Sequence, residues 1–182
     1  VTNENDILHR AIQNNSMKLN EVIETHSPSM DIQISSNFER QIFESSGRDS
    51  DYVNKLMLEF HKNGQELLSP TAIKDIQKTY KSHSVDNKET LEIIKFFYDK
   101  YNYLADPHTA TGLHILNKLN SSEPHISLAC AHPAKFEDAI EQAIGKKPII
   151  PEELKKIFDK EEKMTILDND SNIIKSHIYK TI

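Results

Sequence analysis

Hydrophobic residues recur at helical spacing three times between residues 50 and 101. In the first of these segments Leu56, Met57 and Phe60 share one helix face, and Gly64 is placed to end the helix. A period near 3.6 residues is typical of an amphipathic helix with one buried side. The pattern therefore predicts three helices whose apolar stripes serve as packing surface.

Residues that cap helix N-termini precede these segments. The expected caps are Ser50 or Asp51 for the first helix, Ser69 before Pro70 for the second, and the pair Asp86 and Glu89 for the third. Asp106 before Pro107 repeats the cap-and-proline device and predicts a helix that runs through Leu119. Asp6 is expected to open a shorter helix whose apolar side begins at Ile7.

Two other segments carry the pattern of extended chain. Residues 27–35 place Ile32 and Ile34 at alternate positions after a proline and serines, which suggests a short strand or an extended loop. Residues 125–131 form an apolar run that is too short for a helix and ends before Pro133. This run predicts a buried strand.

Three further helices complete the pattern. One opens at Asn37, one runs from Pro133 to Gly145, and a charged one covers about 151–163. A helix, a strand and a helix thus follow one another between residues 106 and 144, which indicates an α/β fold. The tail carries a second small apolar set, which consists of Ile173, Ile174 and Ile178.

Composition and charge exclude some function classes. The chain of 182 residues has a net charge of −6, so it lacks the basic excess of a protein that binds the nucleic-acid backbone. No apolar run approaches the roughly 20 residues of a membrane helix. The single cysteine, Cys130, suits a reducing cytosol, and we expect a cytoplasmic protein without nucleic-acid or membrane partners.

The first residues do not have the pattern of a natural beginning. Val1 is not a methionine, and Val1-Thr2 before the polar residues 3–6 is typical of a strand that enters a turn. We therefore expect these residues to be a fragment of a longer protein.

Three separated motifs resemble those of the threonine synthases. They are SMDIQISSNFER at residues 29–40, DPHTA at 106–110 and CAHPAKF at 130–136. The family has similar motifs in the same order, with Thr-Ala-His-Pro-Ala-Lys-Phe as the third. The resemblance spans essentially all of this chain and only the later part of a full enzyme.

The resemblance implies a function and a fold. Threonine synthases are lyases that depend on pyridoxal 5'-phosphate and convert O-phospho-L-homoserine and water to L-threonine and phosphate. Their fold, called fold type II, is shared with the tryptophan synthase β-subunit. This chain would be its C-terminal part, predominantly helical with a few short strands. Residues 1–37 and 105–182 would belong to the cofactor-binding domain, and 38–104 would be a helical insertion.

In this family the Schiff-base lysine and the glycine-rich loop for the cofactor phosphate lie upstream of the position of Val1. The four glycines of this chain are scattered singly, so no turn of successive small residues can wrap a phosphate. We therefore expect no catalytic residue here, no independent activity, and no retention of the cofactor without the missing N-terminal half. The alternative is a non-catalytic, threonine-synthase-like remnant or binding module.

The resemblance also implies cofactor-binding positions. Cys130 stands where the family has a threonine that is expected to bond the pyridine nitrogen, and a thiol is a weaker partner than a hydroxyl. The alternative for Cys130 is a small buried side chain. His108 and Thr109 lie at a helix start, which favours anions, and are expected to face the cofactor or the substrate phosphate. The alternative for Thr109 is that it only satisfies local backbone groups. His132 is a proton carrier or bonds its own turn.

Asn37 and Arg40 are the candidate substrate-binding residues. They lie one helical turn apart, and the planar guanidinium of Arg40 suits an anionic substrate, although a surface ion pair is the alternative. None of the nine histidines has a metal-ligand spacing such as H-E-x-x-H, so no metal site is expected.

Overall fold

The computed structural model describes residues 1–120, 122–158 and 160–182. The chain divides into two compact units, Val1–Ile149 and Ile150–Ile182.

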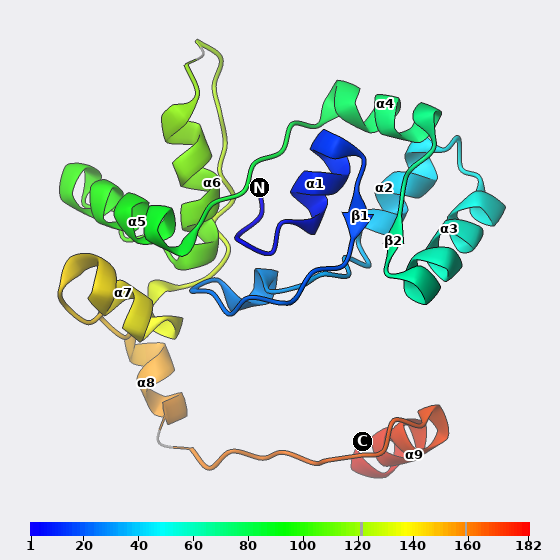
Figure 1. Ribbon diagram of the computed structural model, residues 1–182. Coiled ribbons are helices and arrows are strands. Elements are labelled where there is room, and N and C mark those ends of the chain that lie inside the picture. The colour runs from blue at the N-terminus through cyan, green and yellow to red at the C-terminus, as the bar shows by residue number, and fades with distance from the viewer. Residues whose placement is uncertain (121, 159) are drawn as a thin grey trace. The chain divides into compact units, whose positions relative to one another are not determined.

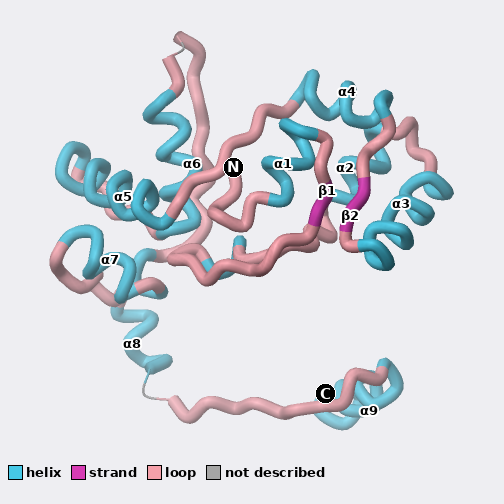
Figure 2. Tube along the Cα trace, in the orientation of Figure 1, coloured by secondary structure: helices cyan, strands magenta, loops and turns pink. Residues whose placement is uncertain are grey.

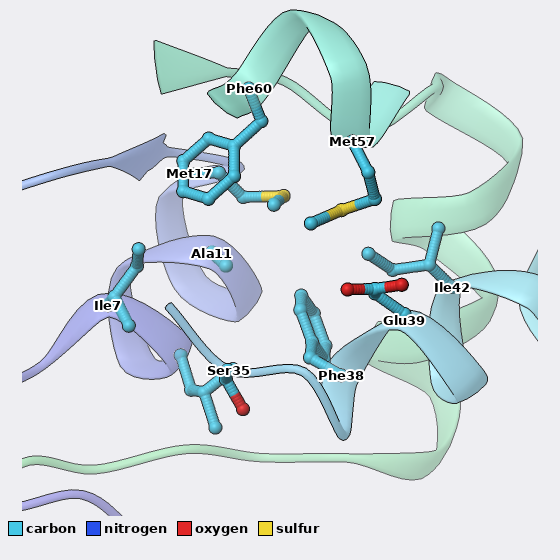
Figure 3. A pocket seen from close by; sticks show the side chains of 10 residues that line it. Ile7, Ala11, Met17, Ser35, Phe38, Glu39, Ile42, Met57 and Phe60 are labelled. Atoms are coloured by element: carbon cyan, nitrogen blue, oxygen red, sulfur yellow. The ribbon is translucent and has the colours of Figure 1, made fainter. Parts of the chain in front are cut away.

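Four helices of the first unit surround one hydrophobic core (Figure 1). They are α1 (Ile7–Asn14), α2 (Phe38–Ser45), α3 (Ser50–Asn63) and α4 (Pro70–Thr79). Phe60 and Ile42 are almost completely buried between them. Figure 3 shows Phe60 and Met57 of α3 pointing toward α1 and α2, around a cavity of about 10 Å³. That volume holds one water molecule at most, so the apolar side chains of these helices pack against one another here, as their apolar stripes predicted.

A second core lies between three later helices of the same unit. They are α5 (Asn87–Tyr101), α6 (Pro107–Lys118) and α7 (Glu137–Ile144). Ile94 of α5, Ala110 of α6 and Ile140 of α7 are fully buried there. This packing fixes α6, whose first turn carries the DPHTA motif.

Strands are few among the described residues (Figure 2). β1 (Met17–Lys18) pairs antiparallel with β2 (Gln65–Glu66), and a single parallel bridge joins Thr2 to Ser84. The fold is therefore predominantly helical with a few short strands, as expected.

Most predicted caps are confirmed. Ser69 caps α4, Asp86 and Glu89 form the capping box of α5, and Asp106 caps α6. The cap predicted for α3 is wrong: Asp49, one residue before the expected Ser50 or Asp51, accepts from the N–H of Tyr52. Asp6 stands directly before α1, as predicted, but its side chain binds Arg10 and does not cap the helix.

The strand predicted at 125–131 is wrong. The segment is a loop, and Ile126 and Leu128 are 86% and 78% exposed. A strand needs a neighbouring strand for its backbone hydrogen bonds. In the described part of the chain, the N–H groups of Cys130 and Ala131 donate instead to side chains in the first turn of α6.

The other short elements differ in detail from expectation. Of the two possibilities for 27–35, the loop is correct, and it contains a 3₁₀ turn, η1 (Pro28–Met30). The helix expected from Pro133 begins as a separate 3₁₀ turn, η2 (Pro133–Lys135), because Phe136 leaves helical geometry at φ −128° and ψ 52°. Gly145 ends α7 in the left-handed conformation, at φ 71°, as predicted.

Among its described residues, the second unit has the helices α8 (Glu152–Phe158) and α9 (Ser171–Thr181). The helix predicted over 151–163 is shorter, and position 159 lies outside the described residues. Ile173, Ile174 and Ile178 are 40 to 46% exposed on α9. Nowhere in the described ranges is a helix both long and apolar enough to span a bilayer.

Candidate functional site

The first turn of α6 brings the three motifs into contact. Asp106 is 1% exposed, and its Oδ1 accepts hydrogen bonds from the backbone N–H groups of His108 at 2.9 Å and Thr109 at 3.4 Å. Its Oδ2 accepts from the hydroxyl of Thr109 and from the N–H of Ala131 at 3.2 Å. One buried carboxylate therefore joins the second motif to the third.

His108 joins all three motifs. Its Nδ1 lies 3.1 Å from Asp106 Oδ1, and its Nε2 lies 3.2 Å from the backbone nitrogen of Ser29, in the first motif. Its ring packs on Phe136 of the third motif with 4.9 Å between centroids. Both ring nitrogens thus face protein groups, and the ring is buried at the junction.

Thr109 holds the backbone of the third motif. Its hydroxyl oxygen accepts the N–H of Cys130 at 2.9 Å while the hydroxyl donates to Asp106. The Cys130 side chain is exposed, with its thiol 3.5 Å from the carbonyl oxygen of Leu128. In these 182 residues the backbone of Cys130 is therefore anchored while its sulfur is exposed.

His132 lies in the same loop but faces its own turn. Its Nδ1 accepts the backbone N–H of Ala134 at 3.1 Å and so caps η2. Lys135 at the end of η2 is exposed. The structure thus places both residues near the junction, and among the described residues it gives His132 a partner within its own turn.

Asn37 and Arg40 meet at the start of α2. Arg40 Nη2 donates to Asn37 Oδ1 at 3.0 Å, and both side chains are exposed. They line a pocket of about 500 Å³ together with the apolar side chains of Phe38 and Ile76. Lys81 also lines this pocket. The two residues come together as their spacing predicted, and within the described ranges no hydrogen bond joins them to Asp106 or His108.

A buried polar network was missed from the sequence. Asp31 Oδ1 accepts from Asn3 Nδ2 at 2.7 Å, Asn5 Nδ2 at 3.0 Å and Thr25 Oγ1 at 2.6 Å. The network ties the loop that carries Ser29 to the first residues of the chain. The sequence feature that could have indicated this network is the pair Asn3 and Asn5 at alternate positions, because asparagine side chains suit both turns and buried hydrogen-bond networks.

Another cluster links α5 to α6. Glu89 Oε1 lies 3.3 Å from His114 Nε2 and 3.2 Å from Lys118 Nζ. Partial burial acts to raise the pKa of Glu89. The hydrogen bond from the N–H of Asp86 and the interactions with Lys118 and His114 outweigh burial, so the pKa is lowered from its ordinary value.

The described residues do not by themselves form a complete site for a phosphorylated cofactor. Gly47, Gly64, Gly112 and Gly145 lie on separate turns or helices, so among the described residues no glycine-rich loop forms a phosphate cup. Nor do His, Cys, Asp and Glu side chains in those ranges gather into a group that could hold a metal ion.

Comparisons with known proteins agree with this geometry. Residues 109–178 match the family model described as threonine synthase, C-terminal. The chain is 37% identical over 172 residues to the threonine synthase of Pseudomonas aeruginosa and 35% identical over 204 residues to that of Saccharomyces cerevisiae. These alignments include 93% and 97% of this chain, but 37% and 40% of those relatives.

Solved structures give the same result. The chain resembles a PLP-bound threonine synthase from Brucella melitensis with a TM-score of 0.85 and 37% identity, over 98% of this chain and 39% of that one. It resembles the yeast enzyme with a TM-score of 0.81, 33% identity and coverage of 98% and 40%. The fold is that of the C-terminal part of a fold type II enzyme. The chain belongs to the threonine synthase family and spans about two fifths of the length of these relatives.

Proposed function

We propose that the protein containing these residues converts O-phospho-L-homoserine and water to L-threonine and phosphate, with pyridoxal 5'-phosphate as cofactor. The observation that carries the proposal is the likeness to the PLP-bound enzyme of Brucella melitensis over 98% of this chain. The contacts of Asp106 and His108 with the other two motifs support it, because residues that form one site must lie together in the folded chain.

In this proposal Cys130, Thr109, His108 and His132 form the wall against which the cofactor ring lies. The cofactor, when bound, supplies the electron sink for carbanion chemistry. The exposed thiol of Cys130 is available to meet the ring nitrogen, since only its backbone is held by Thr109. Within this wall Thr109 also holds the backbone of Cys130, and His108 holds the backbone of Ser29.

Asn37 and Arg40 are proposed to bind the anionic part of the substrate. The bond from Arg40 to Asn37 leaves other guanidinium donors for a carboxylate or phosphate at the pocket. Arg40→Gln is expected to raise KM about tenfold with little change in kcat. Arg48→Gln is the matched control, because among the described contacts the Arg48 guanidinium pairs with the exposed Glu44, and Arg48 is not one of the residues that line the pocket. Equal KM values for both variants would remove Arg40 from the substrate site.

The proposal leaves the Schiff-base lysine and the phosphate cup to a portion outside these 182 residues. Residues 1–37 and 105–182 are assigned to the cofactor-binding domain and 38–104 to a helical insertion. The isolated chain is expected to retain no cofactor. A borohydride-stable adduct of pyridoxal phosphate on one specific lysine of this chain would contradict that assignment.

The direct test uses the natural protein that contains these residues. Incubation with O-phosphohomoserine is expected to release threonine and phosphate in equal amounts. Cys130→Thr is expected to keep this activity, and Cys130→Val, which lacks a polar atom, to lose about tenfold in affinity for the cofactor. Turnover of serine or cysteine derivatives in place of O-phosphohomoserine would overturn the proposed substrate.

A second candidate is a threonine-synthase-like protein without the activity. The observation that favours it is Cys130, where the family has a threonine. A human relative named threonine synthase-like 2 is 30% identical over 175 residues. Cofactor binding without phosphate release, in both the natural protein and its Cys130→Thr variant, would select this candidate.

A further inference from the structure

The carboxylate of Asp106 does more than cap α6. An N-cap needs one oxygen for the free N–H groups of the first turn. Asp49 and Asp86 have only this role among the contacts described, and both sites are exposed. Asp106 is buried and uses its second oxygen for the Thr109 hydroxyl and for the N–H of Ala131, 25 residues further along the chain.

These contacts determine which atoms carry hydrogens. The N–H of Ser29 can only donate, so Nε2 of His108 must accept and carries no proton. The proton of the neutral ring is then on Nδ1, where it donates to Asp106 Oδ1. The Thr109 hydroxyl accepts from Cys130 N–H, so its own hydrogen is free to point at Asp106 Oδ2.

Every group around Asp106 is therefore a donor. A carboxylate has acceptor capacity on both oxygens, whereas an amide of the same shape would direct its NH₂ group at donors on one side. Leaving those donors without an acceptor in a buried place is costly. The site selects a carboxylate and not merely a residue of that size.

We propose that Asp106 is a positioning residue for the cofactor wall: it holds His108 as the Nδ1–H tautomer and, with Thr109, aims the Cys130–Ala131 backbone. The inference rests on the proposed function for its link to the cofactor. Asp106 does not touch the reacting atoms. It acts through Thr109 and Ala131, so replacement of Asp106 is expected to displace the backbone of Cys130.

The experiment compares three substitutions in the natural protein that contains these residues. Asp106→Asn and Thr109→Val each remove part of the acceptor chain, and Thr109→Ser retains it. Asp49→Asn is the matched control, since it alters an exposed helix cap of the same unit. The readouts are the dissociation constant for pyridoxal phosphate, the visible absorption band of the bound cofactor, and ¹⁵N NMR of the His108 ring at pH 8.

We expect Asp106→Asn and Thr109→Val to weaken cofactor binding about tenfold and to shift the visible band. Asp49→Asn should match the parent protein in both respects, and Thr109→Ser, which keeps the hydroxyl, should lie closer to the parent protein than Thr109→Val does. The His108 ring should show a protonated Nδ1 in the parent and a changed tautomer balance in Asp106→Asn. Should Asp106→Asn fail to fold, Thr109→Val against Thr109→Ser decides, because Thr109→Val exchanges the hydroxyl for a methyl group whereas Thr109→Ser keeps the hydroxyl.

Two results would overturn the inference. One is a folded Asp106→Asn variant, or Thr109→Val in its place, with unchanged cofactor affinity and band. The other is a His108 ring protonated on Nε2 in the parent protein. The failure of the proposed function is a separate result: a parent protein that binds no pyridoxal phosphate refutes that function, and the NMR measurement then still decides whether Asp106 sets the His108 tautomer.

Discussion

The backbone N–H of Ser29 donates a hydrogen bond to Nε2 of His108, which lies 79 residues further along the chain, at 3.2 Å. This contact fixes η1 against the first turn of α6. The loop that contains η1 is held from its other side by Asp31, whose carboxylate binds Asn3 and Asn5. The first motif is thus attached both to the beginning of the chain and to the candidate site.

Replacement of His108 is expected to weaken that attachment. His108→Phe keeps a ring against Phe136 but removes the acceptor for Ser29 and the donor to Asp106. Loss of such buried polar contacts should lower the free energy of unfolding by about 1–3 kcal/mol. Urea unfolding of the 182-residue chain measures this. His83→Phe, at an exposed ring, is the control, and an equal effect of both changes would refute the prediction.

Phe60 should be among the most costly positions of the first core. It is 1% exposed, and Phe60→Ala is expected to lower the free energy of unfolding by about 3–5 kcal/mol through lost burial and a cavity. Leu58→Ala, on the same helix at 61% exposure, should change it by no more than about 0.5 kcal/mol. Denaturant midpoints of the two variants test the contrast, which fails if they agree.

Gly112 lies where α6 and the 125–131 loop approach closely. A Cβ at this position would lie 2.5 Å from Ser127 Oγ but 3.7 Å from Ser127 Cβ. Alanine favours a helix interior over glycine by about 1 kcal/mol. Gly112→Ala is therefore expected to stabilise the chain more in a Ser127→Ala background than in the parent. Thermal unfolding of the four proteins of this double-mutant cycle gives the coupling, and a coupling of zero would contradict the close approach.

The cluster around Glu89 predicts a dependence of stability on pH. Its pKa is lowered in the folded state, because the N–H of Asp86, Lys118 and His114 outweigh the opposing effect of burial. A carboxylate with a lowered pKa stabilises the folded state at pH values above its pKa in the unfolded chain, near 4.5. This contribution disappears as the pH falls through its pKa in the folded state. The stability advantage over Glu89→Gln should therefore shrink between pH 6 and about pH 3. An advantage that stays constant would exclude this origin.

Much of the helical structure follows from local sequence. Ser69, Asp86 with Glu89, and Asp106 cap the helices that they were expected to cap, because a cap and the N–H groups it binds lie within a few residues of each other. The meeting of Asn37 and Arg40 is local in the same way, at a spacing of one helical turn. The three family motifs could also be recognised from the order of their residues alone.

Tertiary structure decided the rest. Whether 125–131 forms a strand depends on a neighbour to pair with, and here its last N–H groups bind Thr109 and Asp106 instead. Asp106 reads as a helix cap in the sequence, and only its burial against Ala131 makes it the centre of the candidate site. The sequence by itself determined the helices and the family. The partners of His108 and Asp106 come from distant segments, so only folding could determine them.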